Sequence, residues 1–242
     1  MTTYRGIKGF NIQTVSSDPP APFTGQVWYN STSATVKYFA VLTGSWATGG
    51  NMTDGRADLG GAGTQTAGLA FGGESSTVAA EVATEEYGGT SWTNGGDMTT
   101  AKEGPGGCGT QTAALAIAGY EPPASAKTES YNGTNWTEVN DLNTARHALA
   151  GAGTATAALG FGGAPAPSSA LTELWNGTNW TEVNDVNTAR YGIGSAGKLS
   201  TAALGFGGIT SPPASTGTQA ITESWNGPHA SKAQFHASQN FF

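Results

Sequence analysis

The chain has 242 residues, of which 37 are glycine and 11% are charged, and its formal net charge is −7. So few charged residues exclude a charged helical bundle or a coiled coil, and the negative balance argues against a nucleic-acid binder, which normally carries a basic stripe. Seven tryptophans, seven tyrosines and nine phenylalanines argue against disorder, and the single cysteine excludes an internal disulfide framework. A glycine-rich, aromatic β protein is expected.

Residues 1–43 are predicted to form a separate N-terminal arm that could attach the protein to a virion. Residues 25–39 are typical of two short β-runs around a turn at 30–33, preceded by an extended, proline-bearing linker. The opening residues lack the apolar run of a signal peptide. No apolar stretch approaches the roughly 20 residues needed to cross a bilayer. We therefore expect a protein made in the cytoplasm of its host cell, with no membrane insertion.

Residues 44–227 carry an internal repeat with a period of about 44 residues. The segments 134–146 (TNWTEVNDLNTAR) and 178–190 (TNWTEVNDVNTAR) differ at a single position. Two further markers recur with the same period, and we expect both to be structural. The first is a tryptophan, at Trp46, Trp92, Trp136 and Trp180. The second is a pair of small residues, at Gly72 and Gly73, Ala118 and Gly119, Gly162 and Gly163, and Gly207 and Gly208.

Each repeat is predicted to contain four short strands. In the most regular repeat they are residues 147–153, 155–161, 171–175 and 179–183. The glycine pair ends the second strand where the chain must bend tightly, and Asn176 with Gly177 is a favoured hairpin dipeptide between the third and fourth strands. Glycine, threonine, asparagine and the aromatic residues disfavour helix throughout.

This order of markers, a glycine pair, an aromatic residue, a tryptophan and then an arginine, resembles the kelch family of β-propeller repeats. The resemblance covers roughly residues 44–227 and implies an all-β, kelch-like propeller. The second repeat departs from the pattern, because Ala118 replaces the first glycine and Lys102 replaces the arginine. It is therefore expected to be the least regular blade.

The strand count predicts how the ring closes. After three complete sets of strands, residues 220–225 form an isolated third strand, so the fourth strand of the last blade has to come from the N-terminal side, around Trp46. This predicts a four-bladed ring latched by its two chain ends, which removes exposed sheet edges. An incomplete array and a subunit completed by a neighbour remain open. Residues 228–242 form an irregular C-terminal tail that matches no part of the repeat.

No pattern predicts catalysis, a metal or a cofactor. His147, His229 and His236 are scattered, and with one cysteine they do not assemble a zinc site. Cys108 stands where the other repeats have alanine, which predicts a small buried thiol. Recurring acids are interpreted as scaffold positions, not as the carboxylate pair of a glycosidase; they are Glu129, Glu173, Glu223, Glu138 and Glu182.

Candidate binding residues lie in the connection from each fourth strand to the next first strand. This connection and the loop between the second and third strands are expected to emerge on one face. The second-to-third loops (74–83, 120–127, 164–171 and 209–220) vary while the blades stay constant, which is typical of a scaffold that presents a binding site. For the arginines, the alternative is a brace that binds carbonyls or a glutamate of an adjacent blade. The candidates are Asp141, Asn143, Arg146, Asp185, Asn187 and Arg190.

The opening of the chain, YRGIKGFNIQTV followed by SDPPAPFTGQVWYN, is similar to the start of structural proteins of tailed bacteriophages of marine bacteria. This resemblance implies a virion protein, such as a tail fibre or surface appendage, with other virion proteins as partners. We expect a non-enzymatic protein whose propeller recognises a host surface or glycan. The alternative is a purely architectural decoration or spacer subunit, and a homo-oligomer remains open. The sequence favours both over a propeller glycosidase or an intracellular kelch adaptor.

Overall fold

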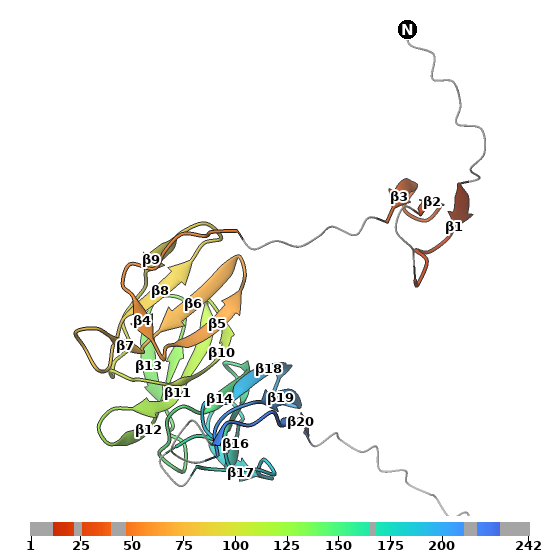
Figure 1. Cartoon of the computed structure of the whole chain (residues 1–242). Helices are drawn as coiled ribbons and strands as arrows, with labels where there is room; N and C mark the ends of the chain where they lie inside the picture. Colours follow the sequence, from red (N-terminus) through yellow and green to blue (C-terminus); the bar gives the residue numbers. More distant parts are fainter. Residues whose placement is uncertain (1–11, 22–25, 40–46, 165–167, 211–216, 228–242) are drawn as a thin grey trace, which may run out of the picture. The chain divides into compact units, whose positions relative to one another are not determined.

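The computed structural model describes residues 12–21, 26–39, 47–164, 168–210 and 217–227. It is an all-β structure that divides into two compact units, Met1–Thr48 and Gly49–Phe242 (Figure 1). No helix within the described ranges has the length and apolar character needed to span a membrane.

The N-terminal unit contains one small sheet of three strands, β1 (Gln13–Val15), β2 (Val27–Asn30) and β3 (Thr35–Tyr38). β2 and β3 are the two β-runs predicted from the sequence, and they pair antiparallel. β1 was not predicted, and it pairs with β2 in parallel. Two parallel strands are joined by a longer connection and not by a tight turn, so the sequence between β1 and β2 contains no hairpin motif that would predict their pairing.

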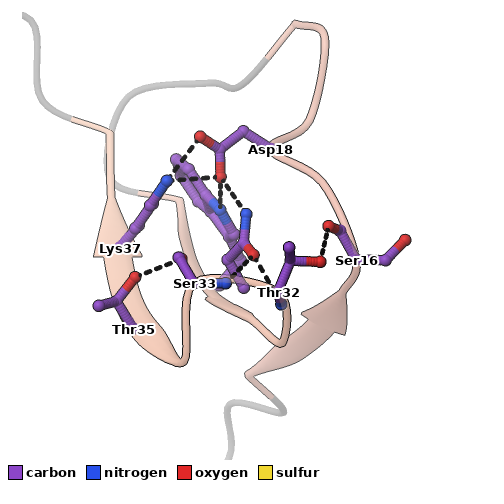
Figure 2. A network of polar contacts seen from close by, with 8 residues as sticks. Ser16, Asp18, Thr32, Ser33, Thr35 and Lys37 are labelled. Atoms are coloured by element: carbon purple, nitrogen blue, oxygen red, sulfur yellow. Dashed lines mark hydrogen bonds and ion pairs between the residues drawn. The ribbon is translucent and has the colours of Figure 1, made fainter.

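Asp18 organises one face of this sheet (Figure 2). Its Oδ1 atom accepts hydrogen bonds from Trp28 Nε1 at 3.0 Å and from Asn30 Nδ2 at 2.8 Å, and Lys37 Nζ lies 2.8 Å from its Oδ2. Hydrogen bonds from Lys37, Asn30 and Trp28 lower the pKa of Asp18 to about 2. Trp28 is 5% exposed, so the polar network fixes a buried indole in a very small sheet.

The second unit contains four successive meander sheets, each with strands hydrogen-bonded in chain order. The first sheet is β5 (Gly60–Thr64), β6 (Ala67–Phe71), β8 (Thr84–Tyr87) and β9 (Trp92–Asn94). The second is β10 (Gly106–Thr110), β11 (Ala113–Tyr120), β12 (Ala124–Tyr131) and β13 (Trp136–Val139). The third is β14 (Ala150–Thr154), β15 (Ala157–Phe161), β16 (Thr172–Trp175) and β17 (Trp180–Val183). The last has three described strands, β18 (Gly194–Leu199), β19 (Ala202–Phe206) and β20 (Thr222–Asn226).

The predicted strand order within a repeat is confirmed. In the third sheet the strands fall within the predicted segments, except that the first begins at Ala150 and extends to Thr154. The glycine pairs follow the second strand in the first, third and fourth sheets, with a positive φ of 64° at Gly72 and 68° at Gly162. In the second sheet the prediction is wrong, because Ala118 (φ 55°) and Gly119 lie within β11, which continues to Tyr120 past a register shift between Ile117 and Gly119. The closing strand expected around Trp46 lies outside the described residues.

The first strands of the sheets pack against one another in the order β5, β10, β14, β18. A Cβ atom on Gly107 would lie 2.5 Å from the carbonyl oxygen of Gly61, and one on Gly151 would lie 2.7 Å from that of Gly107. Glycine is therefore required where these backbones meet. All four strands line one central cavity of about 490 Å³.

Apolar clusters fill the interfaces between consecutive sheets. At the first interface, Phe71 meets Trp136 edge to face, with ring centroids 4.9 Å apart. The last sheet differs, because Leu204 is 42% exposed and Phe206 is 44% exposed, whereas their counterparts Leu159 and Phe161 are buried. No described sheet covers this face of β19.

Candidate functional site

Arg146, a candidate binding residue, lies in the connection between the second and third sheets and is 1% exposed. Its Nη1 atom donates to the carbonyl oxygens of Gly162 at 2.9 Å and Leu171 at 2.6 Å, and its Nη2 atom donates to Glu173 Oε1 at 2.9 Å. The other carboxylate oxygen of Glu173 accepts from the backbone N–H and the side-chain amide of Asn143, both at 2.8 Å. One buried carboxylate thus binds two residues of the connection, Asn143 and Arg146.

This arrangement, which we call the connection brace, recurs in all four sheets. The cation and the glutamate are Arg56 and Glu85 at 2.8 Å, Lys102 and Glu129 at 3.3 Å, Arg146 and Glu173 at 2.9 Å, and Arg190 and Glu223 at 2.7 Å. None of the four cationic side chains is more than 1% exposed. Lys102 therefore performs the arginine's role in the irregular second repeat.

The burial of Arg146 and Arg190 contradicts the prediction that these two arginines bind a ligand. Both guanidinium groups are buried and donate to internal carbonyls and a glutamate, so neither reaches an external molecule. The structure supports the alternative that each arginine braces a loop. The glutamate that it binds belongs to the sheet that follows the arginine in the chain.

Burial and ion pairing shift the pKa values of several charged side chains in the connection brace. Burial lowers the pKa of Lys102 and that of Arg146, although Glu129 and Glu173 oppose the shift. Burial alone would raise the pKa of Glu85, but hydrogen bonds from Thr53 and Arg56 outweigh it and lower that pKa. The pKa of Glu223 is lowered in the same way, because hydrogen bonds from Asn187 and the charge of Arg190 outweigh burial.

Asp141 and Asn143 line an open polar hollow of about 330 Å³ between the second and third sheets. Asn140 Nδ2 donates to Asn179 Oδ1 across it at 2.7 Å. Trp180 is part of the lining but is only 5% exposed, so it offers little ring surface for stacking. The complete lining is Glu138, Val139, Asn140, Asp141, Asn143, Asn179 and Trp180.

Asp185 and Asn187 lie at a different place, beside a cavity of about 70 Å³ between the third and fourth sheets. Asp185 Oδ1 accepts the backbone N–H of Thr172 at 3.1 Å, and Asn187 donates to Glu223. The apolar part of the cavity lining includes Phe161 and Trp225. The six candidate binding residues are therefore divided between two surface hollows and the buried braces.

The two kinds of connection do lie at the same end of each sheet. In the first sheet, β4 (Arg56–Ala57) in the entry connection pairs with β7 (Glu74–Ser75) in the second-to-third loop. Single bridges occupy the same place in the other three sheets; they are Glu103 with Tyr120, His147 with Ala164, and Tyr191 with Ile209. Sequence reasoning missed these bridges because they depend on backbone geometry alone.

Two further reactive side chains lie in the part of the chain that the structure describes, a buried Cys108 and a half-buried His147. Cys108 is 6% exposed, as predicted, and burial raises the pKa of its thiol to about 12. Burial lowers the pKa of His147, whose ring packs 5.2 Å from that of Tyr120. Among the residues described, no group of three or more His, Cys, Asp or Glu side chains is arranged to hold a metal ion.

Comparisons with protein-family models and with curated proteins give no match for this chain.

Proposed function

We propose that this chain is a non-enzymatic virion protein, in a tail fibre or surface appendage, that presents variable loops and a polar hollow to a host-surface glycan. The observation that carries the proposal is the repeated frame. The braces and bridges hold the connections and the second-to-third loops at one end of each sheet, while those loops differ in length and content. A rigid frame with variable loops at one end is a common way to present a binding site.

The hollow between the second and third sheets suits a sugar. It is lined by the carboxylate of Asp141 and by the side chains of Asn140 and Asn143, whose oxygens can accept from hydroxyl groups. The amide nitrogens of Asn140 and Asn143 already donate to Asn179 and Glu173. The buried glutamates Glu129 and Glu173 are already occupied by internal cations. This supports recognition over glycoside hydrolysis, which needs two carboxylates flanking the sugar.

We also propose that the four sheets are the blades of a kelch-like propeller, completed by an N-terminal strand around Trp46. Support comes from the sequential packing of β5, β10, β14 and β18 and from the cavity that all four line. A closed ring would leave no open sheet edge.

The test is binding of the full chain to an array of bacterial surface glycans. We expect at least one glycan to bind, and we expect a variant with Asn140→Ala and Asp141→Ala to lose at least tenfold in affinity for it. The matched control is Glu182→Ala, an exposed acid on β17 outside the hollow. Absence of binding across the array, or equal binding by the double variant, would overturn the recognition role.

A purely architectural role is the second candidate, and the N-terminal sheet favours it. The face opposite Asp18 exposes Val27 (42%), Val36 (62%) and Tyr38 (73%). Exposed apolar patches often mark contact sites between proteins. If the role is architectural, light scattering of the full chain should give an oligomer, and a variant with Val36→Ser and Tyr38→Ser should be a monomer.

A further inference from the structure

The hollow between the second and third sheets contains two carboxylates that the fold does not use. Glu138 lies on β13 and Asp141 lies in the connection that follows it, and both residues are exposed. Within the part of the chain that the structure describes, neither carboxylate accepts a hydrogen bond or forms an ion pair. The equivalent acid one sheet later differs, because Asp185 Oδ1 accepts the backbone N–H of Thr172 at 3.1 Å. Asp141 is therefore available to an external group.

The negative charge beside the hollow exceeds the positive charge. Glu138 stands directly opposite Glu129 in the pairing of β12 with β13, and Glu129 already binds Lys102 Nζ at 3.3 Å. Burial lowers the pKa of Lys102, and the charges of Glu129, Asp141 and Glu138 all oppose that shift. One buried cation thus faces three carboxylates, and none of the residues that line the hollow is cationic. The excess favours a positively charged ligand.

The amides of the hollow offer mainly acceptors. Asn143 Nδ2 directs its two hydrogens to Glu173 Oε2 at 2.8 Å and to the carbonyl oxygen of Trp180 at 3.4 Å. Asn140 Nδ2 donates to Asn179 Oδ1 at 2.7 Å. The Oδ1 atoms of Asn140 and Asn143 accept no hydrogen bond from any residue that the structure describes. A ligand rich in donors therefore suits the hollow better than one rich in acceptors.

An ammonium group has both of these properties, because it is positively charged and carries three donors and no acceptor. A divalent metal ion fits less well, because Ca²⁺ takes six to eight oxygen ligands and no group of three or more His, Cys, Asp or Glu among the described residues is arranged to hold a metal. An arginine side chain would gain little from stacking, since Trp180 is 5% exposed. The volume of about 330 Å³ is at the small end for ligand sites.

We infer that the hollow binds a sugar that carries a free amine, with the ammonium between the carboxylates of Glu138 and Asp141. The amide oxygens of Asn140 and Asn143 accept hydrogen bonds from the hydroxyl groups of the same sugar. This inference rests on the glycan recognition proposed above and names the class of glycan. It also predicts discrimination against glycans that carry carboxylate or phosphate groups, because these would meet like charge in the hollow.

A matched pair of ligands tests the inference. The probes are an oligosaccharide of glucosamine and the same oligosaccharide with every amine acetylated, titrated calorimetrically into the full chain near pH 6, where the amines are protonated. We expect the amine form to bind about tenfold more tightly, which corresponds to one hydrogen bond to a charged group. Glu138→Gln combined with Asp141→Asn keeps the size of both side chains and should abolish this preference. The control Glu182→Gln, which neutralises an exposed acid outside the hollow, should retain it.

Each outcome decides the inference separately from glycan recognition itself. Equal binding of the two oligosaccharides, or a preference that survives the double substitution, would overturn the inference and leave glycan recognition standing. Tighter binding of a lysine-rich peptide of similar length would assign the hollow to a peptide and would also overturn it. If neither oligosaccharide binds but another glycan on the array does, the inference alone fails. Absence of binding across the array overturns both proposals.

The salt dependence of binding covers the case in which the double variant fails to fold. Salt screens attraction between exposed charges, with a Debye length of about 10 Å at about 0.1 M. For the unmodified chain, raising the salt concentration from about 0.05 M to about 0.5 M should weaken binding of the amine form severalfold and leave binding of the acetylated form nearly unchanged. The same salt dependence for both forms would contradict an ammonium held by Glu138 and Asp141.

Discussion

The guanidinium of Arg146 lies 2.9 Å from the carboxylate of Glu173, and neither side chain is more than 1% exposed. Removing two charges from water costs several kcal/mol per ion, which their attraction repays only when hydrogen bonds complete both groups. Here two carbonyls accept from Arg146 and the Asn143 amides donate to Glu173, which leaves only the Nε atom of the guanidinium buried without a partner. Because the same arrangement recurs in the four meander sheets of the second unit, its structural consequence is a fixed path for each connection.

Loss of one partner of this brace should be strongly destabilising. Arg146→Met leaves Glu173 as a buried, unpaired carboxylate, and we expect the free energy of unfolding in urea to fall by about 3–5 kcal/mol. The control is Lys127→Met, which removes a half-exposed lysine whose ion pair with Glu121 is 3.8 Å long and should cost less than about 1 kcal/mol. Adding Glu173→Leu to Arg146→Met should restore part of the loss. Equal costs for the two single variants would contradict the internal role of Arg146.

The lowered pKa values of Glu85 and Glu223 predict acid sensitivity. A carboxyl group whose folded pKa lies below its unfolded pKa contributes stability that is present above the unfolded value, near 4.5 here, and is lost as the pH falls through the folded value. The free energy of unfolding should therefore decline as the pH is lowered below about 5. Glu85→Gln should flatten this decline, and Glu182→Gln, which removes an exposed acid, should not. A decline of the same slope in Glu85→Gln would contradict this assignment.

Much of the fold could be predicted because the repeats of this chain can be aligned with one another, so that each marker residue falls at an equivalent position. The tryptophans marked the starts of the fourth strands and the glycine pairs marked the ends of the second strands outside the second sheet, and β14 to β17 fall where those markers place them. Placing both connections at one end followed from meander topology, and the bridge between His147 and Ala164 agrees with it.

The candidate site could be predicted only in part. Asp141 and Asn143 do line a hollow, but the sequence could not tell an arginine that is exposed from one that is buried. The signal was present in the spacing: a glutamate stands 27 residues after Arg146, 29 after Arg56 and 33 after Arg190. These separations differ because the second-to-third loops lie between the partners. The pairing of each arginine with its glutamate can be recognised only when the third strands of the repeats are aligned with one another.

The close packing of β5 against β10 predicts that replacing glycine by alanine lowers stability at Gly107 but not at the equivalent Gly61. Gly107→Ala would bring a methyl group within 2.5 Å of the Gly61 carbonyl oxygen and force β5 and β10 apart, whereas a Cβ on Gly61 would meet its nearest atom at 3.7 Å. We expect Gly107→Ala to lower the free energy of unfolding by about 1–3 kcal/mol. Gly61→Ala, at the same place in its repeat, should be nearly neutral. Chemical denaturation of both variants checks this, and a loss in Gly61→Ala as large as that in Gly107→Ala would contradict the described packing.

Cys108 allows a last test, because it lines the central cavity and yet is only 6% exposed. Burial raises the pKa of its thiol from 9.0 to about 12, so the reactive thiolate is depleted by about 10³-fold relative to an exposed cysteine. A thiol reagent such as DTNB at pH 8 should therefore leave the native protein unlabelled and release one equivalent of chromophore in denaturant. Ala47→Cys adds an exposed thiol as the control and should be labelled at once in the native state. Rapid labelling of Cys108 in the native protein would show that the cavity admits the reagent and that the inner strands are not packed as described.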